Sequence, residues 1–206
     1  MKLRSLLLVP AAAIALGAAA VQAEPIELTE NGGFETGDFT GWSLFPTGDG
    51  QFSIISPGFE SDFADCIFND VDASAALMKQ ANVGIGTVEP GQTVTIVFDA
   101  RGELGVGAVS FAEFFSEIEG GGTSGAEILG GGPLPLDPDP EVWTRFEFTA
   151  VTGPDVSGGI TLQLTATTAA IEESFARVYF DNVSLVVDGV VPVENGTWTQ
   201  IKDLYR

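Results

Sequence analysis

Two carboxylates near opposite ends of the chain are the residues whose type and placement could do chemistry. Glu35 lies in the opening segment, 31–42, and Asp181 lies in the closing segment, 178–185. If these segments are the first and last parts of one domain, the two side chains could meet beneath it. Two acids held together repel each other, and a calcium ion bound by oxygen ligands would relieve that repulsion. Alternatively, Glu35 caps a turn and Asp181 accepts a hydrogen bond from a nearby backbone amide.

Alternation of apolar and polar residues predicts that both segments belong to an all-β domain. Alternation with a period of two, as at Val94, Ile96 and Phe98, is typical of strands with one buried face. Strands are expected at 93–99, 145–149 and 160–165, and also at about 51–56, 74–81, 107–118 and 175–187. Turn-rich breaks separate them, and the longest covers 119–141. About eight antiparallel strands predict a two-sheet β-sandwich, or jelly roll.

The strand that carries Asp181 changes its alternation halfway along. Apolar side chains occupy even positions before Asp181 and odd positions after Asn182: Ala176, Val178 and Phe180, then Val183, Leu185 and Val187. One face stays buried across this change only if an extra residue is inserted, so we predict a β-bulge at Asp181-Asn182. The alternative is a strand end followed by a new strand. Either arrangement frees Asp181 from the sheet alternation, as a metal ligand requires.

Composition and the first residues limit the function classes. Histidine is absent and Cys66 is the single cysteine, which excludes a histidine base, a histidine metal site and an internal disulfide. Residues 1–23 are predicted to be a secretory signal peptide, because Lys2 and Arg4 precede an uncharged apolar run that ends in small residues. Without them, six basic residues face 29 acidic ones, a balance that repels nucleic acid and anionic lipid. We expect a protein secreted from a bacterial cell or held at its surface.

Three motifs, taken in order, resemble one family of binding modules. They are Asn31-Gly-Gly-Phe-Glu35 followed by Gly41-Trp42, then Trp143-Thr-Arg-Phe-Glu-Phe-Thr149, then Tyr179-Phe-Asp-Asn-Val-Ser-Leu185. The chain resembles carbohydrate-binding modules of families 4, 9 and 22, which are galactose-binding-domain-like jelly rolls. The resemblance implies a jelly-roll domain at 24–190 that binds extracellular polysaccharide. It also implies a structural calcium ion held by Glu35 and Asp181, with Asn31 added from the same loop.

Binding of sugar would require exposed aromatic rings, which stack on pyranose faces. Trp42 and Trp143 belong to the motifs above and are expected in the core. Around 109–118, aromatic residues occupy both odd and even positions, so at least one faces outward unless the strand is covered on both sides. The candidate ligand-binding residues are Phe111, Phe114 and Phe115 from this strand, with Phe59 and Phe63 from an acidic loop. The alternative is that most of the 15 phenylalanines pack in the core.

No catalytic residue is predicted. Among 29 acids some carboxylate pair can always be found, and Glu113, Glu117 and Glu119 fit a solvated strand edge equally well. The final segment, 195–206, places apolar side chains where one face of a short helix would carry them. Such a helix is marginal unless it docks, either on its own domain or on an export or cell-surface partner.

The sequence therefore predicts a secreted, calcium-stabilised, non-catalytic module that binds polysaccharide. A structural or adhesive surface protein without a glycan site is the alternative, and a polysaccharide lyase or glycosidase is the third candidate. Exposed aromatic rings on a concave sheet would favour glycan binding. A flat polar sheet with a long exposed edge strand would favour adhesion, and a deep cleft with convergent acids would favour an enzyme.

Overall fold

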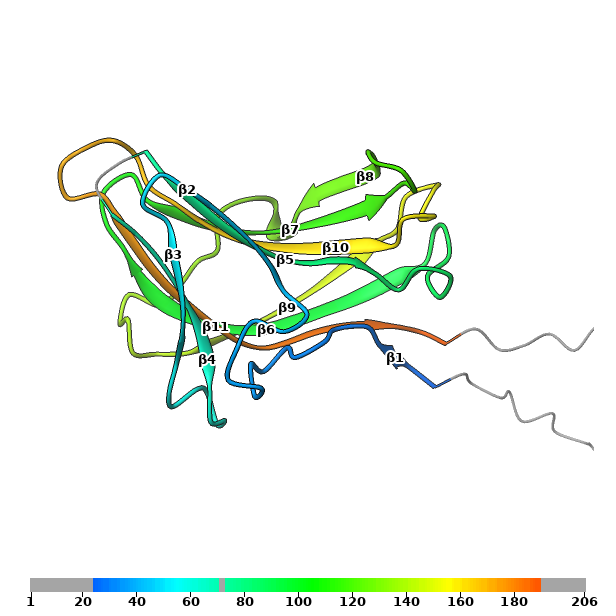
Figure 1. The fold of residues 1–206 in the computed structure, drawn as a ribbon, viewed down its shortest axis with the longest axis horizontal. Helices are drawn as coiled ribbons and strands as arrows, with labels where there is room; N and C mark the ends of the chain where they lie inside the picture. Colours follow the sequence, from blue (N-terminus) through cyan, green and yellow to red (C-terminus); the bar gives the residue numbers. More distant parts are fainter. Residues whose placement is uncertain (1–23, 71–72, 190–206) are drawn as a thin grey trace, which may run out of the picture. The chain divides into compact units, whose positions relative to one another are not determined.

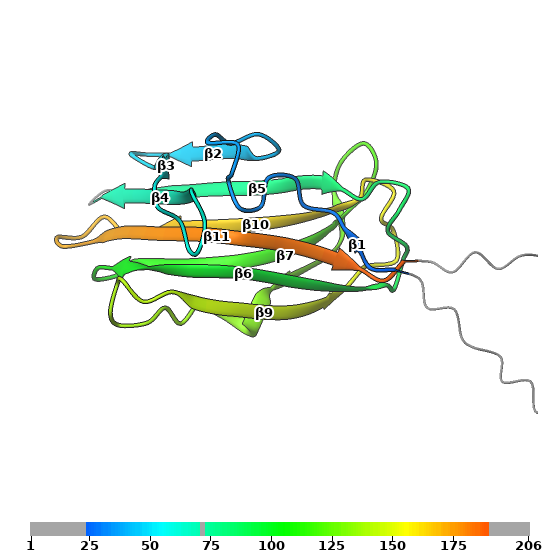
Figure 2. The same ribbon diagram turned by 90° about the horizontal axis from the view of Figure 1, so that it is seen from below.

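The computed structural model describes residues 24–70 and 73–189, and it arranges them as eleven strands in two antiparallel sheets. Sheet A contains β1 (Ile26–Glu27), β3 (Gln51–Ile55), β4 (Ala64–Asp70), β6 (Thr93–Leu104), β9 (Thr144–Val151) and β11 (Phe175–Val187). Sheet B contains β2 (Ser43–Thr47), β5 (Ala75–Val83), β7 (Val109–Glu117), β8 (Thr123–Ile128) and β10 (Ile160–Thr167). The two sheets face each other as a sandwich (Figures 1 and 2), so the predicted all-β jelly-roll class is confirmed.

The strand order places β11 and β10 at the centres of their sheets. Sheet A runs β3-β4-β11-β6-β9, with β1 also paired to β11, and sheet B runs β2-β5-β10-β7-β8. A single 3-10 turn, Leu129–Gly131, follows β8 in the described part. No helix within the described ranges is long and apolar enough to cross a bilayer. The predicted signal peptide and the predicted tail helix lie outside the described residues.

The hydrophobic core is built from the side chains that the alternation assigned to buried faces. In β6, Val94, Ile96 and Phe98 are fully buried, and in β10 Leu162 and Leu164 are too. Burying side chains of this size is the main favourable term in folding. Their partners along each strand point away from the core and form the outer faces of the two sheets.

Four strands were not predicted from the sequence: β1, which is only two residues long, and three others with identifiable reasons. In β4 the first four residues are all buried, so no alternation of apolar and polar residues marks this strand. Strand β2 is a short edge strand that contains Pro46, which is typical of edges. Strand β8 lies within the glycine-rich stretch that was expected to be a loop, and it pairs with β7.

The opening and closing segments lie side by side, as expected. The Val183 amide donates to the Gly32 carbonyl oxygen at 2.9 Å, and the Leu28 amide donates to the Leu185 carbonyl at 2.8 Å. A Cβ atom on Gly32 would overlap the Val183 carbonyl oxygen, so only glycine allows this approach. The Trp42 indole donates to the Asn31 carbonyl at 3.1 Å and fixes the end of the opening loop.

The predicted β-bulge in β11 is confirmed. The register between β11 and β6 shifts between Asp181 and Ser184, and Asn182 adopts a positive φ of 50°. Asparagine tolerates this left-handed conformation better than most residues. The bulge keeps Val183 and Leu185 in the core while Asp181 stays on the outer face of sheet A.

Candidate functional site

Asp181 anchors a loop over the outer face of sheet A. Its side chain is fully buried, and Oδ2 accepts hydrogen bonds from the Phe59 amide and the Ser61 hydroxyl, both at 2.7 Å. Oδ1 accepts a hydrogen bond from the Asn182 amide at 2.7 Å. Glu35 contacts the same loop, because its Oε1 accepts from the Phe63 amide at 3.2 Å. The structure thus brings both predicted carboxylates to the loop 58–63.

Several neighbouring groups shift the pKa of the Asp181 carboxyl. Burial raises the pKa of the Asp181 carboxyl, and the nearby Glu35 charge raises it further, while hydrogen bonds from Ser61, Phe59 and Asn182 act in the opposite direction. A positive ion placed between the two carboxylates would remove their mutual repulsion. Among these influences on the Asp181 pKa, the Glu35 charge is the smallest.

The side chains of Glu35, Asp181 and Asn182 all approach Gly33. A Cβ atom on Gly33 would lie 3.6 Å from Glu35 Cγ, 3.8 Å from Asp181 Oδ1 and 3.9 Å from Asn182 Oδ1. Carboxylate and amide oxygens are ligands that calcium prefers. Within the described ranges no three His, Cys, Asp or Glu side chains gather as a metal site, so backbone carbonyl oxygens would have to complete the shell.

Asn31 has a different surrounding from the other two predicted ligands. Its amide nitrogen donates to the carbonyl oxygens of Asp38 and Thr40 at 3.0 and 3.2 Å. Its side-chain oxygen accepts from the Thr36 amide at 3.2 Å. These hydrogen bonds stabilise the opening loop. The Asn31 side chain therefore contacts residues of its own loop and not Asp181.

Arginine and aromatic side chains cover the rest of the outer face of sheet A. The Arg101 guanidinium lies 4.1 Å from the Tyr179 ring centroid and 5.3 Å from that of Trp143, and it forms an ion pair with Glu141 at 3.0 Å. Phe59 packs against Trp143 at 5.5 Å between centroids. The expectation that Trp143 belongs to the core is therefore wrong. Trp42, in contrast, is buried in the core beside Phe34, as expected.

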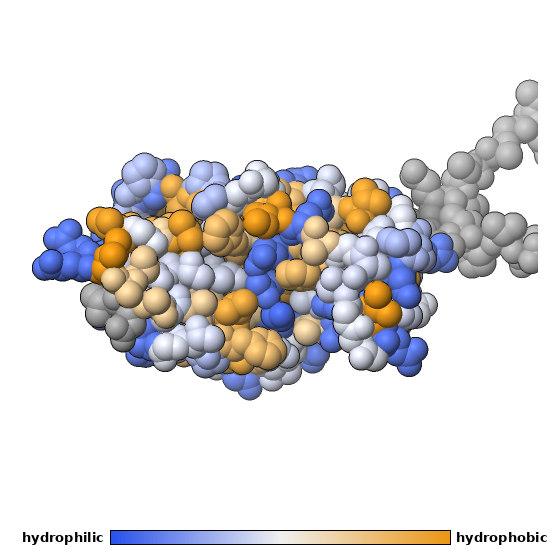
Figure 3. Space-filling model, turned by 90° about the horizontal axis from the view of Figure 1, so that it is seen from above, coloured by the Kyte–Doolittle hydropathy of each residue, from blue (hydrophilic) through white to orange (hydrophobic). Residues whose placement is uncertain are grey.

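The outer face of sheet B is more open and carries three phenylalanines. Phe45, Phe111 and Phe115 point away from the core, and Phe45 is 49% exposed. Cross-strand pairing aligns Phe45 with Leu77, then Thr165 and Phe111. The neighbouring row is polar and consists of Lys79, Gln163 and Glu113, in which the Gln163 amide donates to Glu113. Figure 3 looks onto this side and shows hydrophilic residues crossing it between apolar areas.

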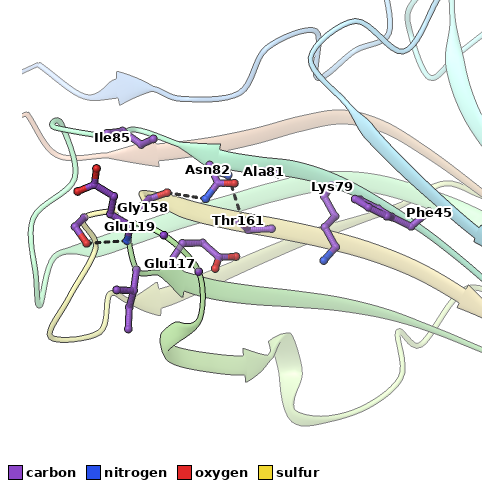
Figure 4. A pocket seen from close by; sticks show the side chains of 13 residues that line it. Phe45, Lys79, Ala81, Asn82, Ile85, Glu117, Glu119, Gly158 and Thr161 are labelled. Atoms are coloured by element: carbon purple, nitrogen blue, oxygen red, sulfur yellow. Dashed lines mark hydrogen bonds between the residues drawn. The ribbon is translucent and has the colours of Figure 1, made fainter.

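A cleft of about 500 Å³ opens on this face. Lys79, Ala81 and Thr161 form part of its lining, while 117–121 and 157–158 contribute loop residues. Figure 4 shows Phe45 and Lys79 toward one end of the cleft and Ile85 and Glu119 toward the other. Hydrogen bonds fix the wall, because Asn82 Nδ2 donates to the Gly158 carbonyl at 2.8 Å and the Asn82 amide donates to Thr161 Oγ1 at 3.1 Å.

The structure divides the five predicted ligand-binding aromatics into three groups. Phe111 and Phe115 lie on the outer face of sheet B, partly exposed. Phe114 is 2% exposed within the core, so the prediction that it contacts a ligand is wrong, because even positions of β7 face inward. Phe59 and Phe63 belong to the loop that covers Asp181 on sheet A, and Phe63 packs against the core.

None of the five predicted aromatics lines the cleft itself, and the sequence analysis missed Phe45 and Lys79, which do. Phe45 lies on the short edge strand β2, which no alternation revealed, and Lys79 was one polar position in a predicted strand. The Lys79 ammonium nitrogen lies 5.2 Å from the Phe45 ring centroid and 5.8 Å from that of Phe115. These contacts depend on strand register between distant segments. The one sequence signal for Lys79 was its odd position in the strand, which places it on the same face as Leu77 and Ala81.

No protein-family model matches the chain, and no curated protein matches its sequence. Solved structures do match its fold. The enzymatically active domain of tailspike protein 4 of bacteriophage CBA120 gives a TM-score of 0.59 at 14% identity over 79% of this chain, which spans only 21% of that protein. The carbohydrate-binding module TmCBM61, solved with β-1,4-galactotriose, gives 0.53 at 17% identity, with 78% of this chain and 97% of that one covered.

The CBM22-1 xylan-binding domain of Paenibacillus barcinonensis Xyn10C gives a TM-score of 0.52 at 12% identity, over 84% of this chain and all of that domain (100%). At such identities the likeness concerns the fold alone. The chain has the β-sandwich fold of carbohydrate-binding modules, and the resemblance inferred from three motifs is confirmed at that level.

Proposed function

We propose that this chain is a secreted, non-catalytic module that binds extracellular polysaccharide on the outer face of sheet B. The observation that carries the proposal is the cleft on that face, which combines the exposed Phe45 ring with amide, hydroxyl and charged groups and has the Phe115 ring beside its Lys79. Binding sites for small ligands typically combine apolar surface with a few polar groups that fix orientation. A pyranose ring presents apolar C–H faces and hydroxyl edges, which match this combination. The galactotriose and xylan named for two structures of the same fold support the same ligand class.

Glu113 and Glu117 are not spaced as a catalytic pair, although Glu117 and Glu119 both line the cleft. Glu113 and Glu117 lie on the outer face of β7, four residues apart along one strand. Their backbones are thus about 13 Å apart at the rise of an antiparallel strand. Paired carboxylates of glycosidases stand roughly 5–10 Å apart. Glu113 also accepts a hydrogen bond from Gln163, which holds it to the sheet.

A structural calcium ion bound by Glu35 and Asp181 is the second part of the proposal. The approach of both side chains to Gly33 and to the loop 58–63 supports it. The ion would join the opening segment to the closing segment and to the loop 58–63. In this account it stabilises the fold and takes no part in glycan contact.

Affinity electrophoresis against a panel of soluble polysaccharides tests the binding proposal. We expect at least one polymer to retard the protein. Phe45→Ala and Phe115→Ala should each weaken binding about tenfold, which corresponds to roughly 1.4 kcal/mol for a ring central to an interface.

The neighbouring core residue provides a matched control. Phe114→Leu should lower stability by about 1–2 kcal/mol and leave retardation unchanged, because Phe114 points away from the cleft. The proposal is wrong if no polymer retards the protein, or if the two outer-face variants bind as the wild type does.

A further inference from the structure

The ammonium group of Lys79 is held on the outer face of sheet B by aromatic rings alone. Its nitrogen lies near the rings of Phe45 and Phe115, at 5.2 and 5.8 Å from their centroids. Cation–π contacts of this kind contribute about 0.5–2 kcal/mol and orient a charge without neutralising it. In the view of Figure 4, Lys79 lies between Phe45 and Glu117 within the lining of the cleft.

Lys79 has no acidic partner in the part of the chain that the structure describes, although the chain contains 29 acids. The ion pairs found there are Arg101 with Glu141 at 3.0 Å and Arg145 with Asp99 at 3.7 Å, and both belong to sheet A. A lysine ammonium carries three hydrogen-bond donors and no acceptor. Its charge is therefore available to an anionic group that enters the cleft.

The acidic residues nearest to Lys79 in the described part of the chain do not form an ion pair with it. Glu113 accepts a hydrogen bond from Gln163, the residue directly opposite Lys79 across the strand pair. Glu117 and Glu119 line the loop side of the cleft, away from the end where Phe45 lies. A ligand with its ring against Phe45 or Phe115 could thus place a carboxylate on Lys79 and its hydroxyls toward Gln163 and Thr161.

We propose that the cleft selects polysaccharides that carry uronic acid residues, with Lys79 binding the sugar carboxylate between the two phenylalanine rings. This inference rests on the proposed function and adds the charge class of the ligand. A charge-assisted hydrogen bond between ammonium and carboxylate is about twice as strong as a neutral one. The net charge of −21 repels a polyanion as a whole, so recognition depends on this one local contact.

Paired polymers that differ only in their carboxylates provide the test. Polygalacturonate, alginate and glucuronoxylan are each compared with their carboxyl-reduced counterparts by affinity electrophoresis at about 0.15 M salt, where long-range repulsion is screened beyond roughly 8 Å. We expect the wild type to bind at least one uronate polymer about tenfold more tightly than its reduced form. Lys79→Gln should abolish that preference while it retains binding to the reduced polymer, and Lys79→Arg should restore most of it.

Arg177→Gln is the matched control, because it removes the same charge from the outer face of sheet A, where Arg177 lies against the Phe68 ring. We expect it to keep the preference for uronate. Equal binding of charged and reduced polymers by the wild type, or a preference that survives Lys79→Gln, would overturn the inference and leave the proposed function standing. Failure of the wild type to bind any charged or neutral polymer would overturn both.

Discussion

The outer faces of the two sheets differ in how their polar groups are satisfied. On sheet A, Asp181 accepts three hydrogen bonds, and Arg101 lies between two aromatic rings with Glu141 as its ion-pair partner. On sheet B, Lys79 contacts rings only and Phe45 is about half exposed. Buried groups that are paired, as the Asp181 oxygens are, hold a fold together, whereas exposed rings beside an unpaired charge are available to a ligand.

The comparison assigns different tasks to the two faces of one sandwich. Changes on sheet A should alter stability and leave binding intact, and changes on the outer face of sheet B should do the opposite. The family resemblance does not by itself distinguish the faces, since the opening and closing motifs and Trp143 all lie on or beside sheet A. The arrangement of side chains makes the distinction.

Removal of calcium should produce the largest change in stability, and it should leave the outer face of sheet B unaffected. An ion present at about 100 times its dissociation constant contributes roughly 2.7 kcal/mol, or about 5–10 °C in Tm for a domain of this size. We expect a chelator to lower the Tm by that amount, and a Glu35→Gln/Asp181→Asn variant to lose the response. Thermal unfolding in calcium and in chelator measures both. Equal Tm values for the wild type in the two conditions would remove the calcium site from the account.

Substitution of Asp65, which faces the core from sheet A, should have a smaller effect on stability and none on binding. Its carboxylate is fully buried opposite Phe180, and neither oxygen has a well-formed hydrogen bond within residues 24–70 and 73–189. Burial raises the pKa of Asp65 well above its ordinary value, and the Cys66 amide offsets this only partly. The folded protein thus keeps a proton that the unfolded chain releases near pH 4.

The sign of the pH dependence follows from this raised pKa. The contribution of Asp65 to stability is fully present below the unfolded pKa and is lost as the pH rises toward the folded pKa. Asp65→Asn should therefore stabilise the protein at pH 7, by about 1–3 kcal/mol, with little gain at pH 3.5. Urea unfolding at both pH values measures this, and glycan binding should not change. A variant less stable than the wild type at pH 7 would contradict the expectation.

Much of the fold could be predicted because one side of most strands is buried. The change of parity between Phe180 and Val183 located the bulge, and the apolar positions of β6 and β10 face the core as expected, although the polar side chains of β10 are buried as well. β4 could not be found this way, since both of its sides are covered and no alternation marks it. Its absence from the prediction also hid Asp65, whose place in the core follows from its parity with Ile67.

The candidate site was harder to predict because it depends on strand register. Phe45, Lys79 and Phe115 come from β2, β5 and β7, and only the pairing of β2 with β5, β5 with β10 and β10 with β7 brings them together. Trp143 was assigned to the core, although it shares odd parity with Arg145 and Glu147, which are exposed. Had this shared parity been given more weight than the family motif, Trp143 would have been predicted on the outer face of sheet A.

Amide chemical-shift mapping with a short oligosaccharide cut from the most tightly bound polymer tests the central claim most directly. The account predicts that the largest shifts fall on β5, β7 and β10, around Lys79, Phe115 and Thr161, with little change on the outer face of sheet A. Shifts concentrated around Trp143 and Tyr179 would contradict it, because they would place the ligand on the face that we assign to stability.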